Sequence, residues 1–165
     1  MAHCVHPDRR LFLATAGVAL VASGAVSTWA AGAVLPSPQA LVEELERALT
    51  KANPLVVMVS LESCPFCRVA RDNYLEPLRL EGLPVVQIDM RSSHAVRDFS
   101  GATVTHDQMV QAWRVTIAPT VLFFGPRGKE IVARMEGSYI ADFYGAYLDQ
   151  RIEQARAVIK SAGFG

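Results

Sequence analysis

Cysteine is scarce in this sequence: its 165 residues include only Cys4, Cys64 and Cys67. Three thiols are too few for the disulfide framework of a small secreted protein. They are also too few for a structural zinc site, which usually takes four Cys or His ligands in two pairs. Net charge is missing as well, because 16 basic residues balance 16 acidic ones. Charge therefore indicates neither a nucleic acid nor an acidic surface as partner. The length suffices for one domain with a substantial core.

Charged side chains are absent from residues 11–35, a run of 25 residues that follows Arg9 and Arg10. The run is rich in Ala, Gly and Val, and small residues stand near its end at Ala31-Gly32-Ala33. A basic region, an apolar region and an A-x-A site predict a secretory signal peptide over residues 1–35. The alternative is an uncleaved N-terminal anchor, because 25 uncharged residues can span a bilayer. The small residues favour cleavage.

The export signal also predicts the compartment. Residues 8–13, Asp-Arg-Arg-Leu-Phe-Leu, resemble a twin-arginine signal, which a receptor reads. Cleavage would remove Cys4 and leave Cys64 and Cys67 as the mature protein's cysteines. An exported protein with one close cysteine pair belongs in an oxidising compartment. We therefore expect a periplasmic protein, anchored to the inner membrane if residues 1–35 are retained.

The two remaining cysteines form the motif Cys64-Pro65-Phe66-Cys67. An apolar, β-branched stretch at 55–59 predicts a buried strand before the motif, and a helix is expected after it. Free N–H groups and a partial positive charge at a helix start stabilise a thiolate. In proteins that use this arrangement the thiol pKa falls from about 8.5 to roughly 3.5–7.5. The motif therefore predicts disulfide exchange, in which Cys64 attacks and Cys67 resolves the mixed disulfide.

The other elements follow from periodicity and from turn residues. Ser37-Pro38 is expected to start the first helix, and Pro77 is expected to end or kink the helix after the cysteines near Glu76. Thr105 and Gln108 match a capping box. The predicted segments are a helix at 39–51, strands at 55–61 and 85–89, a loop or short helix at 90–104, a helix to about 113, a strand at 121–124, a turn at 125–129, a return strand at 130–136 and a helix at 139–160. The inner face of this last helix is expected to carry Ile140, Phe143, Tyr147, Ile152, Ala155 and Ile159.

This order resembles the thioredoxin fold, an α/β fold whose central mixed sheet of about four strands is flanked by helices, here over residues 36–165. Three local matches support the resemblance: the C-x-x-C motif, the segment Val115-Thr116-Ile117-Ala118-Pro119-Thr120 before an apolar strand, and Gly137 after the hairpin. The resemblance implies a cis peptide bond before Pro119. It also implies that the backbone of Ala118 pairs with an extended substrate chain. Pro65 and Phe66 would belong to the same active-site surface.

The sequence departs from thioredoxins proper at several positions. Ser63 stands where they carry tryptophan, and the Pro65-Phe66 pair resembles glutaredoxins instead. Met58 replaces the buried acid that accepts a proton from the second thiol. That role is unfilled or passes to Glu62, which is either a proton-transfer group or a solvated residue at a strand end. With the export signal, the chain is most similar to exported thioredoxin-like proteins associated with periplasmic sulfur oxidation and cofactor maturation.

The sequence thus predicts a periplasmic thiol–disulfide oxidoreductase that needs no cofactor and no metal. Its expected partners are protein thiols and disulfides and a membrane or periplasmic electron donor; a membrane contact is expected only if the N-terminal segment is retained. The direction of electron flow stays open. One alternative is a chaperone for Cu(I), another metal site or a cofactor, because two thiols bind Cu(I) well. Another is a thioredoxin-fold binding module without redox activity.

Overall fold

The computed structural model describes residue 1, residues 34–137 and residues 141–164. Apart from Met1, Val34 and Leu35, the predicted signal or anchor over residues 1–35 lies outside these residues, as do Tyr139 and Ile140 of the predicted closing helix. Within the described residues, no helix combines the length and the apolar character needed to span a bilayer.

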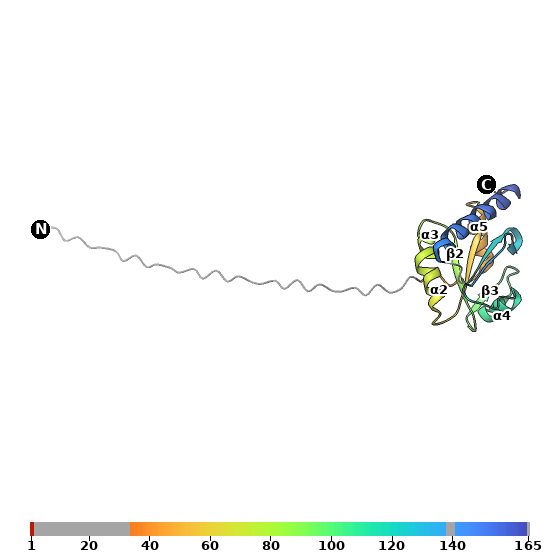
Figure 1. Cartoon of the computed structure of the whole chain (residues 1–165), viewed down its shortest axis with the longest axis horizontal. Helices are drawn as coiled ribbons and strands as arrows, with labels where there is room; N and C mark the ends of the chain where they lie inside the picture. The colour runs from red at the N-terminus through yellow and green to blue at the C-terminus, as the bar shows by residue number, and fades with distance from the viewer. Residues whose placement is uncertain (2–33, 138–140, 165) are drawn as a thin grey trace. The chain divides into compact units, whose positions relative to one another are not determined.

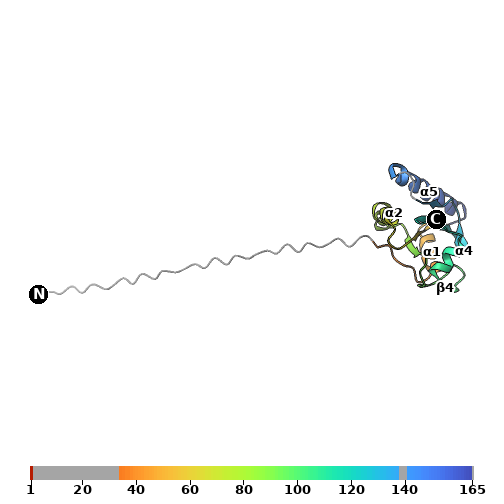
Figure 2. The ribbon, with the colours of Figure 1, turned by 60° about the horizontal axis from the view of Figure 1, so that its bottom comes forward.

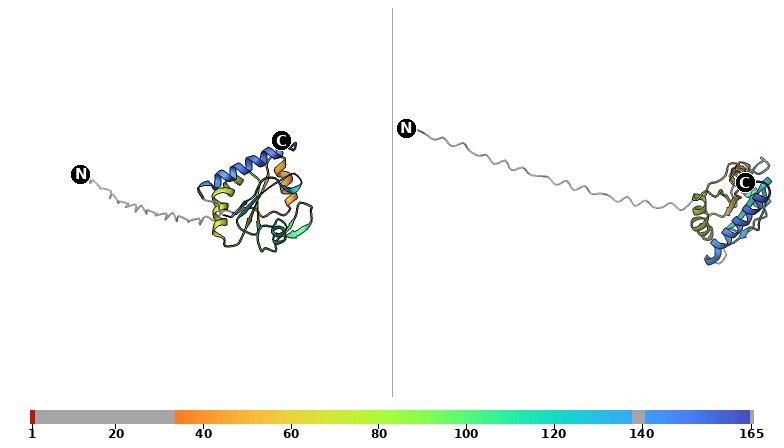
Figure 3. Two further views of the ribbon diagram at one scale, coloured as in Figure 1. Left: turned by 45° about the vertical axis from the view of Figure 1, so that its right-hand side comes forward. Right: turned by 90° about the horizontal axis from the view of Figure 1, so that it is seen from above.

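A mixed sheet forms the centre of the fold, with strand order β2-β1-β5-β6 and with β7 also paired to β5. β1 (Leu55–Ser60) lies parallel to β2 (Val85–Asp89), as expected for two strands joined by a helix. β5 (Thr120–Gly125) lies antiparallel to β1, and β6 (Lys129–Glu130) and β7 (Met135–Glu136) are both antiparallel to β5. The predicted mixed sheet is confirmed (Figure 3).

Helices cover both faces of this sheet. Successive side chains of a strand point to opposite faces, so the apolar residues of β1 contribute to a core on each side. Val56 and Met58 of β1 pack into one core with residues of α2 (Pro65–Ala70) and α5 (Ala141–Ser161). Leu55, Val57 and Val59 pack into the other core with α1 (Leu41–Leu49) and α4 (His106–Ala112). Figures 1 and 2 show the helices on either side of the strands. All of β1 and β5 is buried, so the site at their ends rests on rigid elements.

The helix after the cysteines continues past the predicted break at Pro77. α2 runs into a π-helical turn at Arg71–Leu75 and then into α3 (Glu76–Leu80). In the π turn the N–H of Glu76 donates to the carbonyl of Arg71, five residues back instead of four. Pro77 lies in the first turn of α3, where a missing N–H is tolerated. The helix therefore does not end near Glu76; of the two predicted outcomes, an end or a kink, the structure shows an irregularity, the π turn, which finishes at Leu75 just before Glu76.

The first helix starts later than predicted. α1 begins at Leu41 with Ala40 as its N-cap, so Ser37-Pro38 does not start it. The preceding residues lie along the outer edge of β2 instead. The carbonyl of Pro36 accepts a hydrogen bond from the N–H of Gln87 at 2.9 Å. Leu35 is buried in the core with β1 and β2.

Residues 90–104 contain a small β-hairpin, where the sequence predicted a loop or a short helix. β3 (Ala95–Arg97) pairs antiparallel with β4 (Thr103–Thr105). Strands of three residues are too short to show a period of two, which explains the missed hairpin. The capping box is confirmed: Thr105 accepts from the N–H of Gln108, and the Gln108 side chain accepts from the N–H of Thr105.

Two C-terminal predictions also need correction. The return strand is not continuous over 130–136; β6 and β7 are two short strands with residues 131–134 between them. α5 buries a face that differs in its first turns from the predicted one. Phe143 and Tyr147 are exposed, whereas Tyr144 and Leu148 are buried. The predicted inner positions Ile152, Ala155 and Ile159 are correct.

A buried histidine joins three parts of the chain. Nδ1 of His106 accepts a hydrogen bond from the N–H of Asp89 at 3.2 Å. This bond places the ring proton of the neutral form on Nε2, which lies 3.5 Å from Oγ of Ser37. Burial lowers the pKa of His106 below its ordinary value of 6.5. The neutral ring thus connects α4, the end of β2 and the segment before α1.

This histidine predicts a pH-dependent stability. As pH falls through 6.5 the unfolded chain protonates His106 while the folded chain does not, so the free energy of unfolding decreases. We expect urea unfolding to show a larger loss of stability between about pH 7.5 and about pH 5.5 for the wild type than for His106→Asn. The asparagine oxygen keeps an acceptor for the Asp89 N–H but does not titrate. An equal pH dependence of both proteins would contradict this role.

Candidate active site

Cys64 and Cys67 lie where β1 ends and α2 begins, and a disulfide joins them with their Cα atoms 5.2 Å apart. Cys64 is the N-cap residue of α2, and Pro65 is its first helical residue. The N–H of Cys67 donates to Sγ of Cys64 at 3.1 Å. A helix N-cap normally supplies a side-chain acceptor to such free N–H groups. Here the sulfur of Cys64 is that acceptor, so the same geometry would stabilise a Cys64 thiolate.

The two sulfur-bearing residues differ in exposure. Cys67 has no exposed surface and belongs to the core that contains Met58. Cys64 is partly buried and packs at the edge of the same core. Phe66, between them, is 58% exposed. An incoming partner can therefore reach Cys64, while Cys67 can be reached only from within the protein.

A tight turn carries the chain from β1 to Cys64. The N–H of Cys64 donates to the carbonyl of Leu61 at 3.2 Å, which closes the turn. Ser63 has a φ of 60°, in the left-handed region that residues with a side chain seldom adopt. Such a conformation persists where the surrounding structure holds it. The turn therefore fixes the direction in which Cys64 enters the helix.

The peptide bond between Ala118 and Pro119 is cis, as the resemblance implied. Thr120, the next residue, pairs with Val59 near the end of β1. The proline loop therefore lies at the same end of the sheet as the cysteine turn, on the neighbouring strand. Pro119 is buried, Ala118 is half-buried, and Ile117 is 47% exposed.

Two hydrogen bonds hold the proline loop. Oγ1 of the buried Thr120 donates to the carbonyl of Ile117 at 2.8 Å. The N–H of Gly137, beyond β7, donates to the carbonyl of Pro119 at 2.8 Å. Gly137 has a φ of 73°, which glycine adopts readily, and this fits its place among the matches noted in the sequence. The loop is thus tied both to its own strand and to the end of the hairpin.

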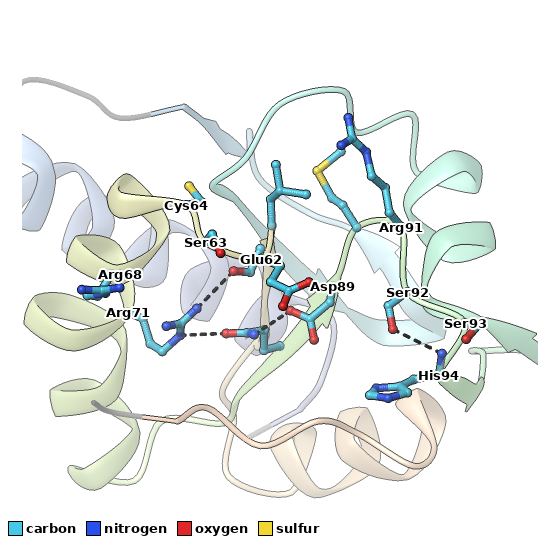
Figure 4. A pocket seen from close by; sticks show the side chains of 14 residues that line it. Glu62, Ser63, Cys64, Arg68, Arg71, Asp89, Arg91, Ser92, Ser93 and His94 are labelled. Carbon is cyan, nitrogen blue, oxygen red and sulfur yellow. Dashed lines mark hydrogen bonds between the residues drawn. The ribbon is translucent and has the colours of Figure 1, made fainter. Parts of the chain in front are cut away.

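Beside Cys64 lies a cavity of about 790 Å³ at the ends of β1 and β2 (Figure 4). Glu62 lines this cavity and is exposed to solvent, so it stands near Cys64 rather than in the core with Cys67. Its role in proton transfer stays a prediction. Met58 is fully buried, so the position of the thioredoxin acid holds an apolar side chain.

Arg71 is a site residue that the sequence reasoning missed. Its Nε donates to Oε1 of Gln87 at 2.9 Å, and its Nη2 donates to Oγ of Ser60 at 3.1 Å. Figure 4 shows its guanidinium pointing from the helix toward these groups. The spacing carried a signal, because Arg68 and Arg71 follow Cys64 by four and seven residues, on one face of a helix.

Metal ligands do not gather in the described part of the chain: no group of three or more His, Cys, Asp and Glu side chains there could hold an ion. His94 and His106 meet edge to face, with ring centroids 5.7 Å apart. Both ring nitrogens of His106 already have partners in Asp89 and Ser37.

We expect the hydrogen bond from the Thr120 hydroxyl to stabilise the proline loop. Thr120→Val keeps the shape but leaves the Ile117 carbonyl without its donor, so we expect a loss of about 1 kcal/mol in the free energy of unfolding. Disulfide exchange with a peptide substrate should slow in parallel, because the loop loosens. Thr120→Ser, which retains the hydroxyl, is the matched control in urea unfolding and in the exchange assay. The role of the hydroxyl is refuted if Ser and Val lower both quantities equally.

Comparison with known proteins places this geometry in a family. Residues 41–152 match the family described as "Thioredoxin-like domain". A solved structure described as "DsbH Oxidoreductase" is 17% identical, with 86% of this chain and 95% of that chain covered and a TM-score of 0.51. The thioredoxin of Fasciola hepatica is 19% identical over 73% of this chain and 99% of its own, with a TM-score of 0.47. No curated protein matches the sequence.

The family match covers both cysteines, the proline loop and every strand of the sheet. The structure described as "DsbH Oxidoreductase" shares the fold at low identity, so it adds no residue-level roles. A strand-to-helix disulfide and a cis-proline loop at one end of a mixed sheet agree with the match. The chain belongs to the thioredoxin-like domain family.

Proposed function

We propose that this protein is an exported thiol–disulfide oxidoreductase that exchanges disulfides with partner proteins through Cys64 and Cys67. The proposal rests on the asymmetry of the pair: Cys64 is only partly buried and its sulfur accepts the Cys67 N–H, while Cys67 is fully buried. Disulfide exchange requires one sulfur that reacts with a partner and a second that resolves the product internally.

Disulfide exchange proceeds in two steps. In the reduced protein the Cys64 thiolate attacks a sulfur of a partner disulfide, forms a mixed disulfide and releases one partner thiolate. Cys67 then loses its proton and attacks Sγ of Cys64. This step closes the disulfide seen in the structure and releases the second partner thiolate. The partner gains two electrons and the protein loses two; with a reducing partner each step runs in reverse.

The proline loop is the proposed docking site for the partner chain. Within the described residues, neither the N–H nor the C=O of Ala118 has a backbone hydrogen-bond partner. An extended peptide could therefore pair with it, as in other cases of strand addition. Phe66, Val69 and Ile117 are large apolar side chains exposed near this end of the sheet. They would contact the side chains of the partner next to its cysteine.

The proposed location and partners rest on the sequence. The basic and apolar N-terminal residues support export to the periplasm, where a membrane or periplasmic donor or acceptor would exchange electrons with the pair. A role beside periplasmic sulfur oxidation is the proposed subtype. It rests on the export signal together with the Pro65-Phe66 dipeptide and the stretch from Asp89 to Trp113, which is longer than the corresponding stretch in thioredoxins proper.

Serine variants test the division of roles. Cys64→Ser should reduce exchange with a model protein disulfide to the uncatalysed background, because the attacking thiol is missing. Cys67→Ser should accumulate a mixed disulfide at Cys64, visible by mass spectrometry, because nothing resolves it. Catalysis by the double variant at the wild-type rate would refute the proposal. Stoichiometric Cu(I) binding without exchange activity would replace it with a metal-handling role.

The helix start predicts a reactive Cys64 thiolate at neutral pH. In the reduced protein, alkylation of Cys64 by iodoacetamide should reach half its maximal rate below about pH 8.5, the value for a free thiol. Cys67→Ser combined with Cys4→Ser isolates the signal of Cys64, and denatured protein gives the reference curve. Equal midpoints for folded and denatured protein would show that the helix start does not stabilise the thiolate. A glutathione redox titration then gives the direction of electron flow.

A further inference from the structure

The cavity beside Cys64 is separate from the proline loop. Its lining comes from the end of β1 and the following turn, from α2 and the π turn, and from β2 and the loop after it. No residue between 115 and 120 lines it. Cys64 therefore borders two surfaces: the loop where a peptide would pair, and a concave cavity on the side of β2. A volume of about 790 Å³ lies in the range of pockets that hold small molecules.

A fixed guanidinium stands in the wall of this cavity. The two hydrogen bonds from Arg71 go to uncharged acceptors, Ser60 and Gln87. Gln87 is itself oriented, because its Nε2 donates to Oδ1 of Asp89 at 2.7 Å. Among the described residues, no carboxylate forms an ion pair with Arg71 within 4.0 Å. The guanidinium is thus held in place by neutral groups and keeps donors for an anion.

Further charges of both signs line the cavity. Arg91 stands on the loop after β2, across the cavity from Cys64 (Figure 4). The N–H of Arg91 donates to Oδ1 of Asp107 at 2.9 Å, which fixes the backbone there. Arg68 adds a third cation, and Glu62 and Asp89 add two carboxylates. A ligand with carboxylates and an ammonium group matches this mixture better than a simple anion or an apolar molecule does.

We propose that this cavity binds the amino-acid end of a low-molecular-weight thiol or its disulfide, and places the sulfur of that molecule at Cys64. Its carboxylates contact Arg71 and Arg91, and its ammonium group faces Asp89 and Glu62. This inference rests on the proposed function of the cysteine pair. It assigns the small thiol to the cavity and the partner protein to the proline loop, so the two would reach one sulfur from different sides.

The chemistry with such a molecule uses no other reactant. The Cys64 thiolate attacks one sulfur of the small disulfide, which forms a mixed disulfide and releases one small thiolate. Cys67 loses a proton and attacks Sγ of Cys64, which closes the protein disulfide and releases the second small thiolate. The two protons of the protein thiols end on the released thiolates through solvent. The small disulfide is reduced by two electrons, and the protein is oxidised by two.

Two small disulfides test this assignment on the full reduced chain. Glutathione disulfide carries carboxylates and ammonium groups, whereas bis(2-hydroxyethyl) disulfide is uncharged. For each variant we take the ratio of two rate constants, that with glutathione disulfide over that with bis(2-hydroxyethyl) disulfide. A general change in thiol reactivity or folding affects both rate constants and cancels in this ratio. The variants are Arg71→Gln, Arg91→Gln and Asp89→Asn. Arg47→Gln is the control, because the exposed Arg47 lies on α1 outside the cavity and forms its ion pair with the partly buried Glu44.

The proposal expects Arg71→Gln and Arg91→Gln each to lower this ratio about tenfold or more, as loss of a charged hydrogen bond would. Asp89→Asn should lower it less, and Arg47→Gln should not change it. A ratio that no cavity variant changes would overturn the proposal. A peptide disulfide flanked by glutamates serves as a third substrate. The proposal would also be overturned if the cavity variants lowered the rate constant with this peptide alone, since the cavity would then serve an acidic partner protein. Absence of exchange with both small disulfides would overturn this proposal if the wild type still exchanges with a protein disulfide, and would refute the proposed function if it does not.

Discussion

The hydrogen bond from the Cys67 N–H to the Cys64 sulfur is the constraint on which the site depends. It exists because a buried strand ends at Ser60 and a turn with one left-handed residue delivers Cys64 to the helix N-cap. With the first sulfur at the cap, the helix places Cys67 three residues later in the core. One sulfur-bearing residue is therefore partly exposed while the other is enclosed in the core, and this difference is what the proposed disulfide exchange requires.

Much of this arrangement could be predicted from the sequence, because it depends on short sequence patterns that have distinct structural meanings. The apolar run before Cys64, the proline after it and the capping box at Thr105 each have a direct physical meaning. The cis bond at Pro119 followed from a family resemblance and not from the residues themselves. Pro119 lies near Cys64 because β1 pairs with β5, and a single sequence predicts this pairing only through the same resemblance.

The features that were missed depend on contacts between distant segments. Nothing local shows that Arg71 meets Gln87, because a π turn and a strand must first bring them together. The hairpin of β3 and β4 is too short for periodicity. On α5, both Phe143 and Tyr144 are aromatic, and only packing against Tyr74 decides that Tyr144 faces inward; the two rings lie 4.8 Å apart.

The segment before α1 has a consequence for where the folding unit begins. Leu35 fills the core, Pro36 accepts from β2, and the carbonyl of Gln39 accepts from Arg97 at 3.0 Å. β2 is an outer strand of the sheet, and an uncovered outer strand is a template for pairing with another molecule. A fragment cut at the start of α1 would expose this edge and invite self-association. Residues 35–39 therefore cover this edge of the sheet and oppose the pairing of two copies of the protein through β2.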